Sequence, residues 1–251
     1  MTDQTLANHF NDYFSITIAD TIELKKVVYK LRYDVYFTEL GYEKSCPVDC
    51  EKDVFDEYST HVLIKHKATN LYAGSVRLVT PPISQPNAPL PFEINCSHSF
   101  DPNKTAFLRE GDSITVGEVS RLAVPATFRL RASDAKTPDG INPERVSMNI
   151  SKEEIRYFPF IAVALYFAAT SIVRYQHLKY AVVMMETRLA RLLKISGICF
   201  IQLGEPIEYH GKRALFYIEP NFIDALKPEL KELYHSLDEQ LVLSVVNKKP
   251  L

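Results

Sequence analysis

Glu118 is the side chain in this sequence best placed to act as a base. It lies in residues 113–124 (SITVGEVSRLAV), whose alternation is typical of a half-buried strand. Burial among apolar neighbours raises the pKa of a carboxyl group towards the range in which it takes up protons near neutral pH. Along such a strand Glu118 shares a face with Ser120, whereas Arg121 points to the other face unless a bulge brings Arg121 and Glu118 together.

Arginines lie in apolar surroundings at two further positions. Arg32 belongs to a predicted helix over residues 21–38, and Arg77 stands between Val76 and Leu78 in a predicted strand. A buried guanidinium keeps its charge and must find carboxylates. The structural alternative for Glu118 is therefore an ion pair with Arg121, Arg77 or Arg32, which would also orient its carboxylate.

Several other chemistries are excluded or disfavoured. The sequence has only 8 glycines, and no two have the spacing of a dinucleotide-binding loop or a Walker loop. Cys46 and Cys50 with His61 have loose spacing for zinc, and no second pair of cysteines exists. Neither Cys96 nor Cys199 lies in a recognisable nucleophile motif, and no G-x-S-x-G elbow is present.

Composition indicates a reduced, cytoplasmic globular protein. A net charge of −2 gives no basic field for nucleic acid. Four scattered cysteines do not form a disulfide scaffold, and the N-terminal residues lack the basic patch and apolar run of a signal peptide. The uncharged stretch 157–173 contains a proline and many alanines, so we interpret it as a buried core helix and expect no integral membrane span.

The periodicity predicts a single α/β domain over residues 1–251. Asp20 and Glu23 have capping-box spacing at the start of the first helix. The segment 81–104, with six prolines, is predicted to be loop, and 125–156 to be a lid or flexible insertion. The remaining expected elements are strands 60–67, 72–79, 113–124 and 180–185, helices 159–177, 188–196 (capped by Thr187) and 222–241, and a hairpin of residues 198–203 and 213–219 turning at His210-Gly211.

Four short motifs in register carry a family resemblance. They are LRYDVY with LGY at 31–42, E-x-D-x-x-D at 51–56, GSVRL at 74–78 and GEVSRL at 117–122. These motifs resemble those of the acyl-homoserine lactone synthases. The overall layout, with its long segment 125–156, looks closer to the exosortase/PEP-CTERM-associated acyltransferases. Those proteins are similar in turn to long-chain N-acyl amino acid synthases, and all lie within the GNAT superfamily.

The resemblance implies a GNAT-like domain with a mostly antiparallel sheet, a central parallel strand pair and flanking helices. It implies an N-acyltransferase that moves a long-chain acyl group from an acyl-carrier-protein or CoA thioester to a small amine, with an amino acid as the expected acceptor. Glu118 and Arg121 would be the catalytic residues. The acceptor would be bound by Arg32, Tyr36, Tyr42, Asp53, Asp56 and Arg77, with Asp53 and Asp56 as the partners of Arg32.

Two tyrosines depart from the autoinducer-synthase pattern. Tyr36 replaces a phenylalanine of that pattern, and Tyr42 stands near its tryptophan. The tyrosine rings keep an aromatic wall, but their hydroxyl groups make it more polar. The acceptor need not therefore be the same amine. Alternatives that stay open are an acyl-homoserine lactone synthase using S-adenosylmethionine, a non-enzymatic fatty-acyl-binding protein, and a merely solvated acidic loop at 51–56.

The donor side favours a carrier protein over free CoA. The residues after Val124 (PATFRLRASDAK) contain no glycine, whereas a CoA pyrophosphate is usually held by a glycine-rich loop. The expected donor-binding residues are Ser120, Leu122, Val124, Arg129, Arg131 and Met184, and the expected carrier-docking residues are Arg188, Arg191 and Lys194. The alternative interpretation of these arginines and of Lys194 is that they only keep the surface soluble. We expect no metal and no bound cofactor.

Overall fold

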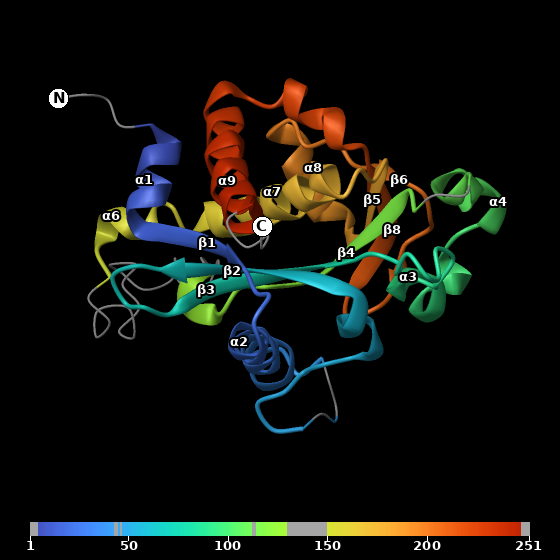
Figure 1. Ribbon diagram of the computed structural model, residues 1–251, viewed down its shortest axis with the longest axis horizontal. Helices are drawn as coiled ribbons and strands as arrows, with labels where there is room; N and C mark the ends of the chain where they lie inside the picture. The colour runs from blue at the N-terminus through green and yellow to red at the C-terminus, as the bar shows by residue number, and fades with distance from the viewer. Residues whose placement is uncertain (1–4, 43–44, 46, 112–113, 130–149, 247–251) are drawn as a thin grey trace.

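The computed structural model describes residues 5–42, 45, 47–111, 114–129 and 150–246. Its centre is one sheet whose strands run in the order β1-β2-β3-β4-β5-β8-β6, with β7 also paired to β8 (Figure 1). The strands are β1 Phe14–Ile18, β2 Ser59–His66, β3 Tyr72–Val79, β4 Val116–Ala123, β5 Tyr180–Glu186, β6 Ile201–Gln202, β7 Ile207–Glu208 and β8 Lys212–Ile218. All pairs are antiparallel except β4 with β5, which confirms the predicted mixed sheet with a central parallel pair.

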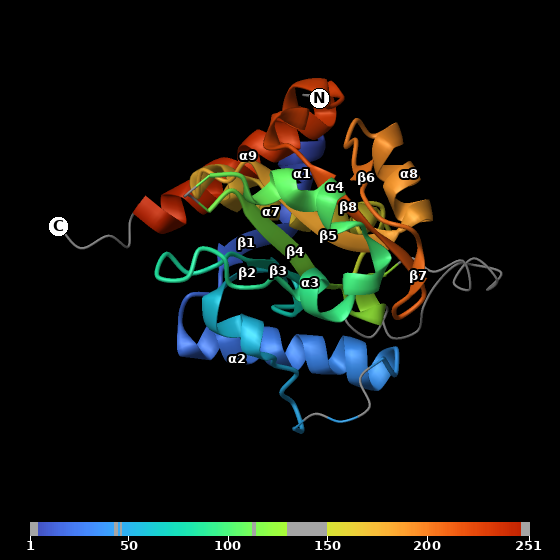
Figure 2. The same ribbon diagram turned by 90° about the vertical axis from the view of Figure 1, so that its right-hand side faces the viewer.

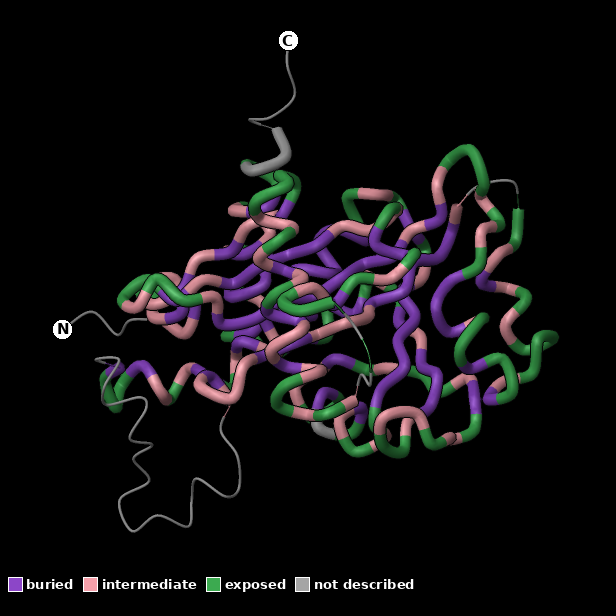
Figure 3. The backbone as a smooth tube through the Cα atoms, turned by 90° about the horizontal axis from the view of Figure 1, so that it is seen from below, coloured by how far each residue is buried: buried purple, intermediate pink, exposed green. Residues whose placement is uncertain are grey.

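Helices cover both faces of the sheet. Helix α2 (Ile22–Arg32) lies on one face, while α1 (Leu6–Tyr13), α7 (Pro159–Tyr175) and α9 (Pro228–Val246) lie on the other (Figures 1 and 2). Helix α7 packs across β2 to β5, and α9 lies along α7 and β1. Figure 3 shows buried backbone concentrated in the middle of the molecule and exposed backbone mostly at its periphery.

The first helix carries the residues of the first motif. Its cap is Thr21, whose hydroxyl accepts a hydrogen bond from Leu24 N, so the helix begins one residue later than the Asp20 spacing predicted. The helix continues as a π-helical segment, Tyr33–Glu39. Gly41 follows at φ +62°, in the left-handed region that glycine adopts most easily. The predicted extent of 21–38 is thus close to the observed one.

Helix α7 is the crossover between the two parallel strands β4 and β5. It begins with Pro159, which lacks the N–H that a first-turn residue would leave unbonded. The apolar composition of residues 157–173 matches the burial of the helix, whose residues 164–173 are all buried. Within the described part of the chain, no helix combines the length and the apolar character needed to cross a membrane.

Strands β4 and β5 pair only at their beginnings. Their register runs from Val116 with Tyr180 to Glu118 with Val182. Both strands then continue, to Ala123 and Glu186, without pairing to each other. The sheet therefore opens between their carboxyl ends, and this opening positions the candidate site.

Several segments differ from the prediction. The proline-rich segment 81–104 is not all loop, because Pro91 and Pro102 each start a short helix. The additional elements are α3 Pro91–Asn95, α4 Pro102–Thr105, α6 Lys152–Ile155 and 3-10 helices at Val54–Tyr58, Ser97–Ser99, Ala106–Arg109, Ala126–Phe128 and Pro220–Ala225. Helix α1 and strand β1 were not predicted. Of the proposed insertion 125–156, residues 130–149 lie outside the described part of the chain.

The C-terminal part follows the prediction with local changes. Helix α8 (Thr187–Ile195) includes Thr187 as its first residue instead of being capped by it. Gly197 follows the helix at φ +92°, in the left-handed region that glycine adopts most easily. The hairpin turn at His210-Gly211 joins β7 to β8, and β6 pairs with β8 as well. Helix α9 begins only at Pro228, because the 3-10 turn Pro220–Ala225 precedes it.

Candidate active site

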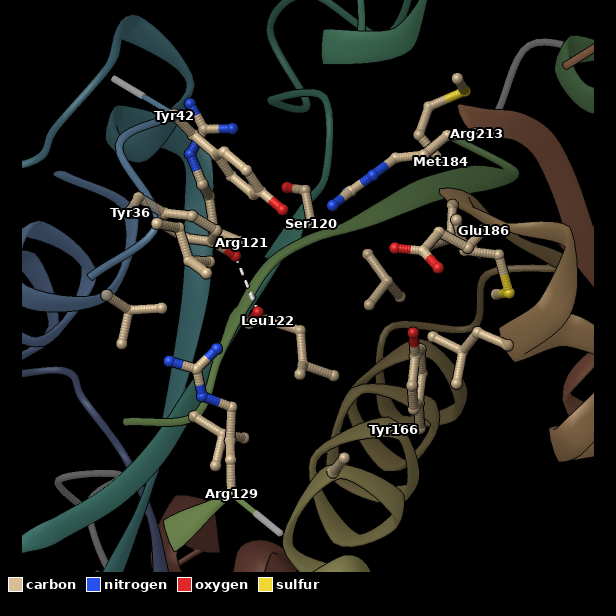
Figure 4. Close-up of a pocket in the computed structure, with 18 of the residues that line it drawn as sticks. Tyr36, Tyr42, Ser120, Arg121, Leu122, Arg129, Tyr166, Met184, Glu186 and Arg213 are labelled. Atoms are coloured by element: carbon tan, nitrogen blue, oxygen red, sulfur yellow. Dashed lines mark hydrogen bonds between the residues drawn. The ribbon is translucent and has the colours of Figure 1, made fainter. Parts of the chain in front are cut away.

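A cavity of about 660 Å³ occupies the opening between β4 and β5. Residues 119–122 of β4 and 183–186 of β5 line it, together with Tyr36 from the π-helical segment and Tyr166 from α7. Figure 4 shows Tyr36 and Arg121 approaching from one side and Tyr166 from the other. Most of the exposed wall of this cavity is apolar. The cavity is therefore suited to a ligand with a long apolar part.

A second, smaller cavity adjoins the large one and reaches Glu118. Its volume is about 60 Å³. Tyr36, Ser120, Arg121 and Arg213 belong to the walls of both cavities. The two spaces thus share a boundary at the bulged end of β4, and Glu118 faces the smaller one.

Glu118 combines deep burial with a single described backbone contact. Glu118 is only 3% exposed, and its Oε2 accepts a hydrogen bond of 2.8 Å from Phe92 N of α3. Burial raises the pKa of the Glu118 carboxyl to about 8, and the Phe92 hydrogen bond opposes this only in part. A carboxyl group with such a pKa can accept a proton from a substrate near neutral pH.

The raised pKa of Glu118 predicts a pH-dependent stability. Because the folded state holds this proton more tightly than the unfolded chain, whose carboxyl has its ordinary pKa of 4.5, the free energy of unfolding falls as pH rises from about 4.5 to about 8. We expect Glu118→Gln to lack this fall. Urea denaturation of both proteins between pH 5 and pH 9 measures it. A stability difference that stays constant over this range would contradict the burial argument.

Three arginines and three carboxylates form a network beneath the small cavity. Arg32 donates to Asp56 at 2.7 Å and also pairs with Glu51. Arg77 donates to Asp53 at 2.6 Å and to Asp56 at 3.0 Å. Arg32 is thus joined to Asp56 as predicted, but its second partner is Glu51, whereas Asp53 pairs with Arg77. These contacts exclude the interpretation of residues 51–56 as a solvated loop.

Burial and charge oppose each other within this network. Arg32 and Arg77 are 0% and 1% exposed, so their charges must be balanced inside the protein. Burial alone would raise the pKa of Asp56, but the hydrogen bonds and charge of Arg32 outweigh it and hold the pKa well below its ordinary range. Arg77 also donates from Nε to the Ser120 hydroxyl at 3.0 Å. Glu118 stands apart from these ion pairs, because the described ion-pair partners of Arg32 and Arg77 are acidic side chains of residues 51–56.

A bulge in β4 turns Arg121 into the site. The register against β3 shifts between Ser75 and Arg77, and Arg121 has φ +52°. Its Nε donates to Glu51 at 3.0 Å, and its guanidinium lies 5.7 Å from the ring of Tyr36. The regular alternation placed Arg121 on the face opposite Glu118, with a bulge as the condition for bringing them together. The bulge is present, and Arg121 lines the small cavity that Glu118 also lines.

Aromatic side chains form one wall of the site. The Tyr36 hydroxyl donates to Leu122 O at 2.7 Å, as the dashed line in Figure 4 marks. Tyr36 and Tyr42 stack at 6.4 Å, and Tyr42 stacks on His210 at 4.9 Å. The predicted aromatic wall therefore exists, and the β7–β8 turn extends it through His210.

The predicted donor-binding residues lie around the large cavity, except one. Ser120, Leu122, Val124, Arg129 and Met184 line it, whereas Arg131 lies outside the described residues. The guanidinium of Arg129 pairs with Glu39. The Glu39 carboxylate also accepts from Ala126 N at 3.0 and 3.1 Å. Arg129 is therefore held by an acidic side chain at the edge of this cavity.

The three basic residues of α8 that were predicted to dock a carrier protein lie in two different surroundings. Arg188 lies on the cavity wall, while Arg191 and Lys194 are exposed. The sequence analysis missed other residues at the site: Cys96, Tyr166, Tyr209, His210 and Arg213. The His210-Gly211 pair marked a hairpin turn, but local sequence gave no sign that this hairpin reaches β4.

The structure disfavours the thiol alternative and does not test the zinc alternative of Cys46, Cys50 and His61. Cys96 lines the small cavity, and burial raises the pKa of its thiol to about 11, which disfavours a nucleophilic thiolate. Cys199 is exposed, and Cys46 lies outside the described residues. Among the residues that the structure describes, no group of three His, Cys, Asp or Glu side chains has the arrangement of a metal site.

Comparison with known proteins identifies the fold. Residues 31–137 match the family described as Acetyltransferase (GNAT) domain. No curated protein sequence matches the chain. Among similar solved structures, TofI in a ternary complex with an inhibitor and MTA is 16% identical with a TM-score of 0.57, over 87% of this chain and 99% of that chain. The N-acyl amino acid synthase FeeM from uncultured soil microbes is 12% identical with a TM-score of 0.54, over 85% of this chain and 94% of that chain. The CoA-dependent acyl-homoserine lactone synthase MesI is 18% identical with a TM-score of 0.53, over 90% of this chain and 95% of that chain. The domain match and this fold indicate an acyltransferase.

Proposed function

We propose that the protein is an N-acyltransferase that moves a long-chain acyl group from an acyl-carrier-protein thioester to the amine of a small acceptor, an amino acid. The observation that carries this proposal is the placement of Glu118. It faces a small cavity that adjoins the large apolar one, and its pKa of about 8 suits a base near neutral pH. The acyl group would occupy the large cavity and the acceptor amine the small one.

The reaction then proceeds by direct attack. Glu118 takes a proton from the acceptor ammonium, and the free amine attacks the thioester carbonyl carbon. The C–N bond forms and the C–S bond breaks. The nitrogen gives its second proton to the leaving thiolate, which departs as the thiol, and Glu118 releases the first proton to solvent. Backbone N–H groups at the bulge of β4 are the candidate donors for the developing oxyanion. The raised pKa of Cys96 is consistent with a route that has no acyl-enzyme intermediate.

Two features support a carrier protein as the donor. The first turn after β4 offers its Ala126 N–H to Glu39, so an acidic side chain occupies a donor that a CoA pyrophosphate would need. A carrier-bound pantetheine has one phosphate and depends less on this turn. The second feature is α8, whose Arg188 lines the cavity and whose Arg191 and Lys194 are exposed on the same helix, as docking of an acidic carrier protein would require.

The docking surface gives a direct prediction. The double variant Arg191→Glu with Lys194→Glu should lower kcat/KM with an acyl-carrier-protein thioester by about tenfold or more, because charge reversal weakens steering of an acidic partner. The same variant should keep its rate with an acyl-pantetheine thioester. Lys26→Glu, an exposed change on α2 at the far face of the sheet, is the matched control. Equal losses with both donors would contradict docking at α8.

A thiol-release assay tests the proposed function. The protein is incubated with long-chain acyl-carrier-protein thioesters and a pool of the twenty amino acids, and free thiol is measured. Release that depends on the amino acid is the expected result. Release only with S-adenosylmethionine, with a lactone product, would assign an acyl-homoserine lactone synthase instead. Acyl chains bound without any thiol release would leave a fatty-acyl-binding protein.

A further inference from the structure

Arg213 is a cation at the site with no described acidic partner. It lies on β8 and lines both the large and the small cavity. Its Nε is buried and, among the described residues, has no hydrogen-bond partner. Figure 4 shows the side chain pointing across the cavity towards Ser120. A buried N–H group without a partner costs free energy, so this position favours a ligand that accepts a hydrogen bond there.

The neighbouring charges leave Arg213 available. Arg121, the other guanidinium on the small cavity, is held by Glu51 at 3.0 Å and by Asp53 at 3.5 Å. Glu186 lies opposite Arg213 on β5, but no ion pair within 4.0 Å joins these two residues. Glu118 shares the small cavity and, with its raised pKa, is mostly protonated at pH 7. The net charge that Arg213 presents to a ligand is therefore positive.

The size of the small cavity limits which ligand can use both Glu118 and Arg213. In an α-amino acid, the amine and the carboxylate are attached to the same carbon atom. A base for the amine and a cation for the carboxylate must therefore face one small space. The cavity of about 60 Å³ meets this condition, since Glu118 and Arg213 both belong to its wall.

We propose that Arg213 binds the α-carboxylate of the acceptor and so selects amino acids over amines that lack a carboxylate. This inference rests on the proposed function, whose acceptor it narrows to α-amino acids with a free carboxylate. Charge-assisted hydrogen bonds from a planar guanidinium fit the two oxygens of a carboxylate. An acid and its primary amide have the same shape but differ in this charge, so the pair isolates the contribution of Arg213.

The first test compares each amino acid with its primary amide as acceptor for the wild-type enzyme and for Arg213→Gln. The wild type should prefer the acid by about 10- to 100-fold in kcat/KM, through a lower KM. Arg213→Gln should lose this preference, because its KM for the acid should rise by about 10- to 100-fold more than its KM for the amide. Lys212→Gln, which removes an exposed charge from the adjacent position on β8, should keep the preference.

A second test uses only the wild-type enzyme, in case Arg213→Gln does not fold. The α-hydroxy acid that matches the best amino acid retains the carboxylate but has no amine. It should inhibit thiol release competitively against the amino acid, and the hydroxy amide should not. Equal use of acids and amides, or equal inhibition by both hydroxy compounds, would overturn the role of Arg213. Absence of thiol release with every acceptor would instead overturn the proposed function itself.

Discussion

Replacing Glu118 by glutamine is expected to lower kcat/KM for acyl transfer by about 100- to 10,000-fold, the usual contribution of general base catalysis. Glutamine keeps the shape of the side chain and can still accept the hydrogen bond from Phe92 N, but it cannot take a proton. The loss should therefore appear in catalysis without a change of fold. Initial rates of thiol release, with circular dichroism spectra of both proteins, measure it.

The pH dependence supplies an internal control for the Glu118 variant. In the wild type, kcat/KM should rise with pH to a plateau, with a midpoint near the Glu118 pKa of about 8, because only the carboxylate acts as base. The Glu118→Gln enzyme should lack this titration. Glu57→Gln, which removes an exposed carboxylate of the 3-10 helix Val54–Tyr58, should keep both the rate and the profile. Full activity of Glu118→Gln would remove Glu118 as the base.

The second large effect is on stability and concerns Asp56. Its carboxylate accepts hydrogen bonds from Arg32, Arg77 and Asp53 N, and the residue is 2% exposed. In Asp56→Ala, the two buried guanidinium groups lose their shared acceptor. Breaking a buried ion pair in this way typically costs about 3 to 5 kcal/mol in the free energy of unfolding. Urea denaturation near neutral pH measures this loss.

An exposed ion pair in the same region provides the contrast. Lys30 and Asp34 pair at 2.9 Å on the surface of the same helical segment. Asp34→Ala should change the free energy of unfolding by less than about 1 kcal/mol, because exposed pairs contribute little. A loss in Asp56→Ala no greater than that in Asp34→Ala would show that the buried network does not stabilise the fold as its contacts imply.

The parts of the site that the sequence predicted are those fixed locally. Glu118, Arg121 and Arg77 lie on predicted strands, and the burial of Glu118 and Arg77 follows from their apolar neighbours. The alternation alone turned Arg121 away from Glu118, so the sequence showed that a bulge was required to bring them together but did not locate it. Arg32 was expected to need carboxylates for the same reason of burial.

The errors concern partners that are distant in the sequence. The position of Arg32 on α2 does not determine whether its second ion-pair partner is Asp53 or Glu51. That partner depends on how the segment 51–56 packs against α2. Arg213 and His210 reach the site only because β8 pairs with β5, over 25 residues away in the chain. Likewise, Pro91 begins a helix that presents Phe92 N to Glu118, whereas proline content alone suggested loop. Such contacts follow from tertiary packing and carry no local signal.

The central claim is that this chain joins an acyl group to the amine of an amino acid. Mass spectrometry of the product tests it most directly. The wild-type protein is incubated with a long-chain acyl-carrier-protein thioester and ¹⁵N-labelled amino acids. We predict an N-acyl amino acid that carries the label in its amide and that forms at least about 100-fold more slowly with Glu118→Gln. Hydrolysis of the thioester to free fatty acid, with no labelled amide under any of these conditions, would contradict the claim.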